Sequence, residues 1–173
     1  MTDRRERIGL IRELLLARDW GGVAAFPASR GWLLRRLLSA LQDPSPGLRW
    51  RAVVALGRVA RTFPSGDPVL REFVRSLFWT MNDESGNLCR MAPEALGEIL
   101  RARPEFRSEF APLLPQYLVE EPFETGALWA LCRLADAGWL TATLPADLLA
   151  PSLDHPDPRR RGLARRLGLH LAV

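Results

Sequence analysis

One small-residue helical pattern recurs four times along the chain, and it constrains the fold more than any other feature. Each copy places alanine and leucine ahead of a small residue, and the four copies align at Gly57, Gly97, Cys132 and Gly168. The steps between these positions are 40, 35 and 36 residues. Periods of this length are typical of two-helix solenoid repeats. The spacing therefore predicts an all-α protein, an α-solenoid of stacked two-helix repeats.

The second helix of the first clear repeat shows the physical basis of the pattern. Its small and apolar residues share one helical stripe, at Leu48, Ala52, Ala55, Leu56 and Val59. Such a stripe predicts a buried face, and its alanines would let neighbouring helices approach closely. An acidic break precedes each such helix, with proline in all but the second, and these breaks supply capping residues and helix stops. Strand patterns are nearly absent, so we expect nine or ten helices.

The whole chain, residues 1–173, is predicted to form a single repeat domain. N-terminal helices are expected at about 3–30, and the repeats at about 32–62, 67–102, 106–137 and 146–173. Pro93 interrupts the pattern of its repeat. Its helix either bends there or begins late, with Pro93 in the first turn.

Charge composition bears on the class of partner. The chain has 24 basic and 20 acidic residues, a net charge of +4, and no lysine. The sequence pI near 10.3 overstates this basicity, because few groups titrate between neutrality and the pKa of arginine. Arginine in place of lysine is typical of codon bias, although arginine-rich surfaces also bind phosphate well.

Apolar segments are too short for a membrane protein. No stretch approaches the roughly 18 apolar residues that a membrane helix needs, and Arg12 and Glu13 interrupt the apolar region that a signal peptide would require. Cys89 and Cys132 are too few for a disulfide framework. We therefore expect a cytoplasmic protein with free thiols and no membrane contact.

The repeats resemble HEAT repeats, and among them the short bacterial kind similar to repeats of phycobilin lyase subunits. A closer resemblance, to a set of uncharacterised bacterial HEAT-repeat proteins, rests on the segments NDESG at 82–86 and APEALGEI at 92–99. It covers the chain from about Leu10 to the C-terminus. The chain departs from the pattern at Cys89, where the set prefers an aromatic residue. The resemblance implies a fold and supplies no activity.

Residues that could carry catalysis are sparse. His155 and His170 have no companion cysteine or well-spaced acidic pair, and the paired His-Glu motifs of iron-binding HEAT-repeat hydroxylases are absent. No phosphate-binding loop, nucleophile elbow or dinucleotide fingerprint occurs. Cys132 stands where other repeats have glycine, which favours a packed small residue over a nucleophile. We therefore expect a non-enzymatic protein with no catalytic residue, metal or cofactor.

The register of the repeats predicts a binding surface on the concave face. Glu94, Trp129 and Arg165 align with Val54 and should lie off the buried stripe. The candidate surface comprises Arg51, Arg58, Glu84, Arg90, Glu94, Glu98, Trp129, Arg133 and Arg165. Glu94 and Glu98 would form an exposed carboxylate pair beside an exposed Trp129 ring. The alternative is a set of salt bridges between repeats around a partly packed tryptophan.

The turn at 82–86 is the most specific local feature, and two interpretations remain open for it. Asp83 or Ser85 would cap the following helix while Gly86 adopts a turn conformation. Alternatively, the turn binds a ligand, for which Glu84 is the candidate residue.

Two classes of function follow from these features. The leading hypothesis is a scaffold that binds a protein or peptide on its concave face, as a monomer or weak dimer. The alternative is a nucleic-acid-binding or DNA-repair module similar to the HEAT-like alkylpurine DNA glycosylases, favoured by six tryptophans and the arginine bias. Against it, Glu94 and Glu98 would stand where phosphates approach. The repeat type also suggests an accessory lyase or cofactor chaperone.

Overall fold

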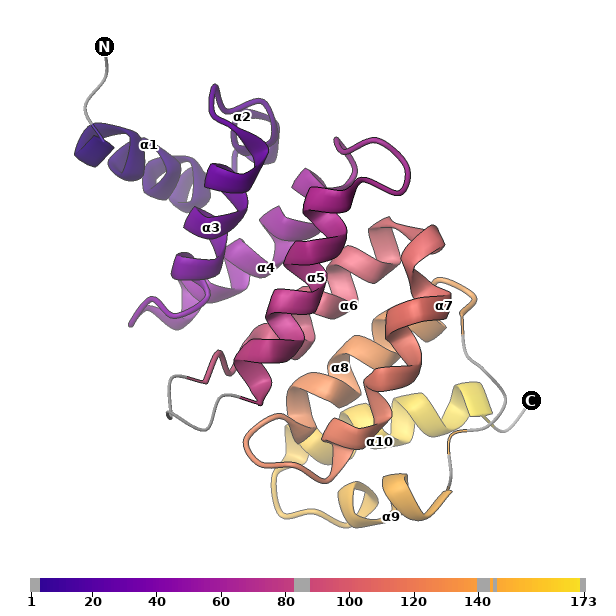
Figure 1. Ribbon diagram of the computed structural model, residues 1–173. Coiled ribbons are helices and arrows are strands. Elements are labelled where there is room, and N and C mark those ends of the chain that lie inside the picture. The colour runs from indigo at the N-terminus through magenta and orange to yellow at the C-terminus, as the bar shows by residue number, and fades with distance from the viewer. Residues whose placement is uncertain (1–3, 83–87, 140–143, 145, 172–173) are drawn as a thin grey trace.

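The computed structural model describes residues 4–82, 88–139, 144 and 146–171, and among them it contains helices and no strand (Figure 1). The α-helices are α1 (Arg4–Ala17), α2 (Trp20–Ala24), α3 (Arg30–Ala40), α4 (Pro46–Ala60), α5 (Pro68–Met81), α6 (Ala92–Ala102), α7 (Arg107–Phe110), α8 (Glu124–Ala135), α9 (Ala146–Leu153) and α10 (Pro158–Leu171). Three short 3-10 helices are η1 (Pro104–Phe106), η2 (Ala111–Leu113) and η3 (Pro115–Leu118). The prediction of an all-α protein is confirmed.

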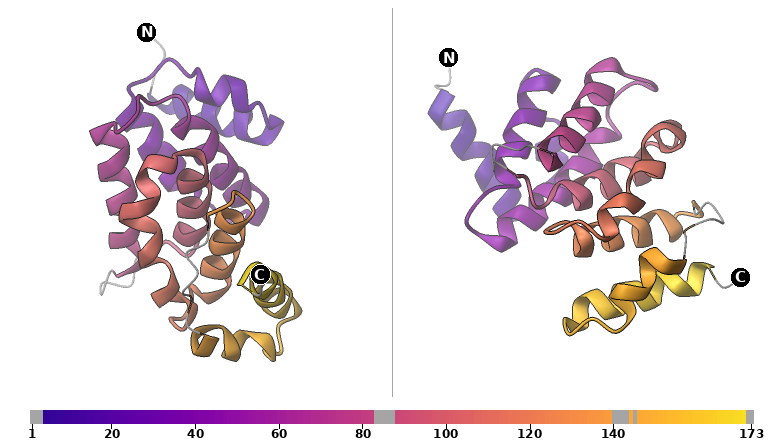
Figure 2. Two further views of the ribbon diagram at one scale, coloured as in Figure 1. Left: turned by 90° about the vertical axis from the view of Figure 1, so that its right-hand side faces the viewer. Right: turned by 60° about the horizontal axis from the view of Figure 1, so that its bottom comes forward.

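The helices form two layers. Helices α4, α6, α8 and α10 contact one another in chain order, and we call them the even layer. The odd layer consists of α3, α5, the α7 region with its 3-10 helices, and α9. Members of the odd layer pack on the even helix that follows them in the chain. The termini consequently lie at opposite ends of the molecule (Figure 1, Figure 2).

Small residues set the spacing within the even layer. A Cβ atom added at Gly97 would lie 2.7 Å from Ala130 Cα, and one at Gly57 would lie 3.0 Å from Glu98 Cβ. Cys132 is buried as predicted, with its Sγ atom 3.4 Å from the Leu163 carbonyl oxygen. At Gly168 the nearest side-chain atom would be 3.8 Å away, which is an ordinary contact. Neighbouring helices thus approach closely at Gly57, Gly97 and Cys132, whereas the contact at Gly168 is less close.

Prolines determine where several helices begin or break. Helix α6 begins late, at Ala92, so Pro93 lies in its first turn, where a missing N–H costs little. In the third repeat Pro104, Pro112 and Pro115 divide the odd-layer element into η1, α7, η2 and η3. The caps expected from Asp83, Ser85 and Gly86 lie outside the described residues.

The N-terminal region differs from expectation at one point. The sequence predicts a helix from Asp3 to Arg18, stopped by Trp20-Gly21-Gly22, and a short helical turn around Val23 to Phe26. Helix α1 ends at Ala17 as this pattern indicates, but the short helix begins earlier than predicted, at Trp20. Asp19 caps this short helix by accepting a hydrogen bond from the Gly22 N–H at 2.8 Å. None of the described helices combines the length and the apolar character needed to cross a membrane.

Candidate functional site

Glu94 and Glu98 occupy the centre of the even layer, on α6. Both are buried, with 5% of each residue exposed, so the prediction of an exposed carboxylate pair is wrong. The cover comes from the two flanking helices. Trp50 on α4 and Trp129 on α8 reach across α6, and their ring centroids lie 5.3 Å apart. The expected exposed Trp129 ring is therefore half-buried.

Glu98 is compensated by two arginines. Its carboxylate accepts hydrogen bonds from Arg133 Nε at 2.8 Å and from Arg101 Nη2 at 2.8 Å. Arg133 comes from α8, so this contact joins two repeats, as the salt-bridge alternative predicts. A buried carboxylate with two guanidinium partners is a structural link, and its charge is not offered to a ligand.

Glu94 has the opposite environment. Its Oε2 atom is buried and has no hydrogen-bond partner, and the carboxyl group packs against Gly126, where an added Cβ would lie 2.6 Å from Oε2. Burial raises the pKa of Glu94 to about 7, and the attraction of Arg159 offsets only part of this shift. Glu94 is therefore a carboxyl group that changes protonation near neutral pH.

Two arginines flank the tryptophan pair. The guanidinium carbon of Arg159, from α10, lies 5.1 Å from the Trp50 ring centroid, and that of Arg133 lies 5.6 Å from the Trp129 ring. These four side chains form the aromatic row of the even layer, in the order Arg159, Trp50, Trp129 and Arg133. Sequence reasoning names Trp129 and Arg133 but misses the other two members. Trp50 lies one turn before Val54 on the same stripe, and this spacing could have identified it.

The remaining candidate residues are dispersed. Arg58, Arg90 and Arg165 are exposed and form no ion pair within the described part of the chain. Arg51 is half-buried and borders a hollow next to Trp50. Glu84 lies outside the described residues. The structure thus brings together Glu94, Glu98, Trp129 and Arg133, while the outlying arginines remain separate.

The hollow beside Trp50, which we call the Trp50 hollow, lies between α2 and α4. Its volume is about 340 Å³, and it is lined by Arg18, Trp20, Gly47, Trp50, Arg51 and Val54. Two tryptophans and two arginines are therefore among the lining residues of one small cavity, and no acidic residue lines it.

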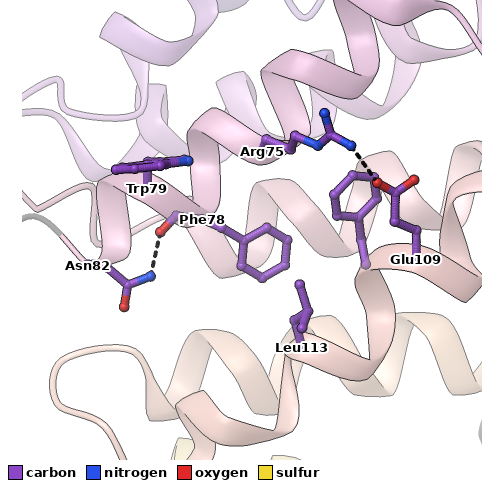
Figure 3. A pocket seen from close by; sticks show the side chains of 7 residues that line it. Arg75, Phe78, Trp79, Asn82, Glu109 and Leu113 are labelled. Carbon is purple, nitrogen blue, oxygen red and sulfur yellow. Dashed lines mark hydrogen bonds and ion pairs between the residues drawn. The ribbon is translucent and has the colours of Figure 1, made fainter.

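A second pocket, the odd-layer pocket, lies between α5 and the α7 region (Figure 3). Its volume is about 480 Å³, and it is lined by Arg75, Phe78, Trp79, Asn82, Glu109, Phe110 and Leu113. The stacked rings of Phe78 and Phe110, 6.1 Å apart, contribute its apolar surface. Arg75 and Glu109 form a 3.0 Å ion pair at one side. Trp79 is 78% exposed, and the helical pattern of α5 does not predict an exposed tryptophan at this position.

Cysteine and histidine contribute little chemistry. Cys89 and Cys132 are free and buried, and burial raises the pKa of both thiols to about 11. Neutral thiols are poor nucleophiles and metal ligands. His170 Nε2 lies 3.4 Å from Asp136 Oδ1, and no three acidic, histidine or cysteine side chains of the described residues are placed to hold a metal ion.

No protein-family model matches the chain. A protein of Archaeoglobus fulgidus, described as uncharacterized, is 35% identical to it over 92 residues, and the match covers 51% of this chain and 48% of the relative. The chain therefore spans about half the length of this curated relative. The similarity brings no activity with it, so any statement on function rests on the geometry of the sites.

Proposed function

We propose that the protein is a non-enzymatic interaction module, a HEAT-like α-solenoid that binds a protein or peptide partner on the exposed face of its even layer. The spacing of the two layers supports the solenoid. Even helices pack closely, whereas hollows of about 480 Å³ and 420 Å³ separate successive odd-layer elements. A stack with one layer packed more closely curves toward that layer, which makes the even layer its concave side.

The aromatic row is the observation that carries the proposal. Tryptophan and arginine are the residues most enriched at the energetic centres of protein interfaces, and here two of each span α4, α8 and α10. The burial of Glu94 and Glu98 removes two carboxylates from this face, while Arg58 and Arg165 remain exposed. The resulting surface is aromatic and basic.

Paired charge reversals test the proposal without touching the packed residues. Arg58→Glu with Arg165→Glu alters the even-layer face, and Arg5→Glu with Arg35→Glu places the same charge change on exposed positions of α1 and α3. Affinity capture from the source cells should yield a protein that the first variant loses and the second retains. A partner kept by the first variant and lost by the second would contradict the proposal.

Nucleic-acid binding is the second candidate, because one observation favours it. The two carboxylates that would repel phosphate are buried, and an arginine lies on each side of the tryptophan pair in the aromatic row. Fluorescence anisotropy with labelled single-stranded and duplex DNA measures this activity. A nucleic-acid module would show binding that weakens steeply with salt, and the salt dependence would decrease in Arg58→Glu with Arg165→Glu.

A further inference from the structure

We propose that the Trp50 hollow binds an acidic peptide segment of the partner. An apolar or aromatic side chain of that segment enters between Trp20 and Trp50, and neighbouring carboxylates pair with Arg18, Arg51 and Arg159. This inference rests on the proposed function and names the chemistry of the partner.

The shape of the hollow suits one large side chain. Its volume of about 340 Å³ lies at the lower end of the range for small-ligand pockets. Trp20 and Trp50 are both half-buried, so each ring is held by the protein and still presents a surface to the cavity. An apolar side chain placed there would leave water without requiring either helix to move.

The charges around the hollow are only partly compensated, because the one nearby carboxyl group in the described ranges that attracts any of them is that of Glu94, which acts on Arg159. Arg18 and Arg51 line it, and Arg159 lies over the Trp50 ring. None of the three forms an ion pair with a carboxylate of the described residues. Some arginines elsewhere do pair with carboxylates, as in Arg12–Asp43, Arg30–Asp67 and Arg75–Glu109. Three unpaired guanidinium groups around one apolar cavity favour an anionic occupant, and guanidinium groups bind carboxylates in a bidentate geometry.

The backbone at Arg18 adds a separate argument. Its φ angle is 57°, in the left-handed region where helix ends usually carry glycine. The Arg18 N–H donates a hydrogen bond to the Leu15 carbonyl oxygen, and the Asp19 N–H donates one to the Leu14 carbonyl oxygen. Helix α1 therefore ends in a Schellman motif, with arginine at the position that glycine usually occupies. A residue other than glycine is disfavoured there, and the hollow gives the arginine side chain a role that glycine cannot fill.

The distribution of charge favours a peptide over nucleic acid. At the far end of the even layer Asp136 pairs with Arg166 at 2.6 Å and lies 3.7 Å from Arg133, which interrupts the basic surface. A nucleic-acid strand needs positive charge at successive phosphates along its path. The Trp50 hollow instead gathers three charges around a cavity for a single side chain.

Fluorescence anisotropy with short labelled peptides tests the assignment on the full chain. The probe carries one phenylalanine between pairs of glutamates, and the controls replace the glutamates by glutamine or the phenylalanine by alanine. We expect the acidic phenylalanine peptide to bind at least about tenfold more tightly than either control. The glutamine peptide loses the charged hydrogen bonds to arginine, and the alanine peptide loses the burial of the apolar ring. Equal binding of the glutamine peptide would overturn the proposal.

Arg18→Gly separates binding from folding. It removes a guanidinium group and relieves the backbone, so we expect a Tm higher by about 2–4 °C together with about tenfold weaker binding of the probe. Arg51→Ala should weaken binding similarly, and Arg35→Ala, on α3, should leave it unchanged. Unaltered binding in Arg18→Gly, or tighter binding of single-stranded DNA of equal charge at the same site, would overturn the proposal.

The affinity-capture experiment distinguishes this proposal from the broader proposal that the even-layer face binds a protein or peptide partner. A partner that is lost by Arg58→Glu with Arg165→Glu but retained by Arg18→Gly would contradict the role of the hollow and leave the even-layer face as the binding surface. A partner retained by both variants would contradict both proposals.

Discussion

Glu94 and Glu98 lie one turn apart on α6, and their surroundings are of opposite kinds. Glu98 has two guanidinium partners, whereas Glu94 Oε2 has no partner. The sequence register places both residues on the correct helix. Their burial could not be read from it, because the neighbouring helices cover them: Glu94 packs against Gly126 of α8 and Glu98 against Gly57 of α4, and both glycines are remote from them in sequence.

Replacing Glu94 by glutamine should change how stability depends on pH. The pKa of Glu94 is about 7, above its ordinary value of 4.5, so the folded state holds this proton more tightly than the unfolded state. The associated stabilisation is complete below about pH 4.5 and is lost as the pH rises through about 7. Glu94→Gln should remove this loss and exceed the wild type by about 1–3 kcal/mol at pH 8. Urea unfolding at pH 4.5 and pH 8 measures this difference in the free energy of unfolding between the variant and the wild type.

Glu98→Gln is the matched control for that experiment. It removes the negative partner of Arg101 and Arg133, so it should lower the free energy of unfolding at pH 8 by about 1–3 kcal/mol. If both variants shifted the free energy of unfolding at pH 8 in the same direction, the two carboxyl groups would not have the opposite environments described above.

At the scale of the elements, contacts between small residues determine how closely the even helices pack. Periodicity in the sequence predicts these helices and the close approaches at Gly57 and Gly97. It does not predict the division of the third odd-layer element, because three prolines there outweigh an apolar run. It also predicts the short helix α2 three residues too late, because the helix begins at the cap supplied by Asp19.

Gly97→Ala should destabilise the protein by about 1–3 kcal/mol. The added Cβ would lie 2.7 Å from the Ala130 Cα atom, and a backbone atom cannot move aside as a flexible side chain can. Gly9→Ala on α1 is the control, since a Cβ there meets nothing within 4 Å and alanine favours the helix by up to about 1 kcal/mol. Thermal unfolding followed by circular dichroism compares them. Equal melting temperatures would contradict the close approach of α6 and α8.

At the scale of the whole molecule, each even helix contacts its neighbours in the chain order. Helix α6 lies in the middle of this succession, with α4, α5 and α8 packed on it and most of its residues buried, whereas α10 contacts α8 and α9 at the end of the succession. The repeat period predicts this succession of helix pairs. The location of unpaired charge could not be predicted in the same way, because it depends on which arginines find carboxylates between repeats.

Because backbone contacts run mainly between successive helices, amide hydrogens should exchange at graded rates, slowest in α6 and fastest in α1 and α10. Arg160 offers a local test, because it donates to Ser152 on α9 at 2.9 Å and to Glu124 on α8 at 3.1 Å. Arg160→Ala should therefore speed exchange in α9 and α10 and leave α1 to α4 unchanged. Arg166→Ala, which removes a more exposed pair with Asp136, should have a smaller effect. A uniform increase across all helices would indicate one cooperative globular unit and would contradict the proposed solenoid.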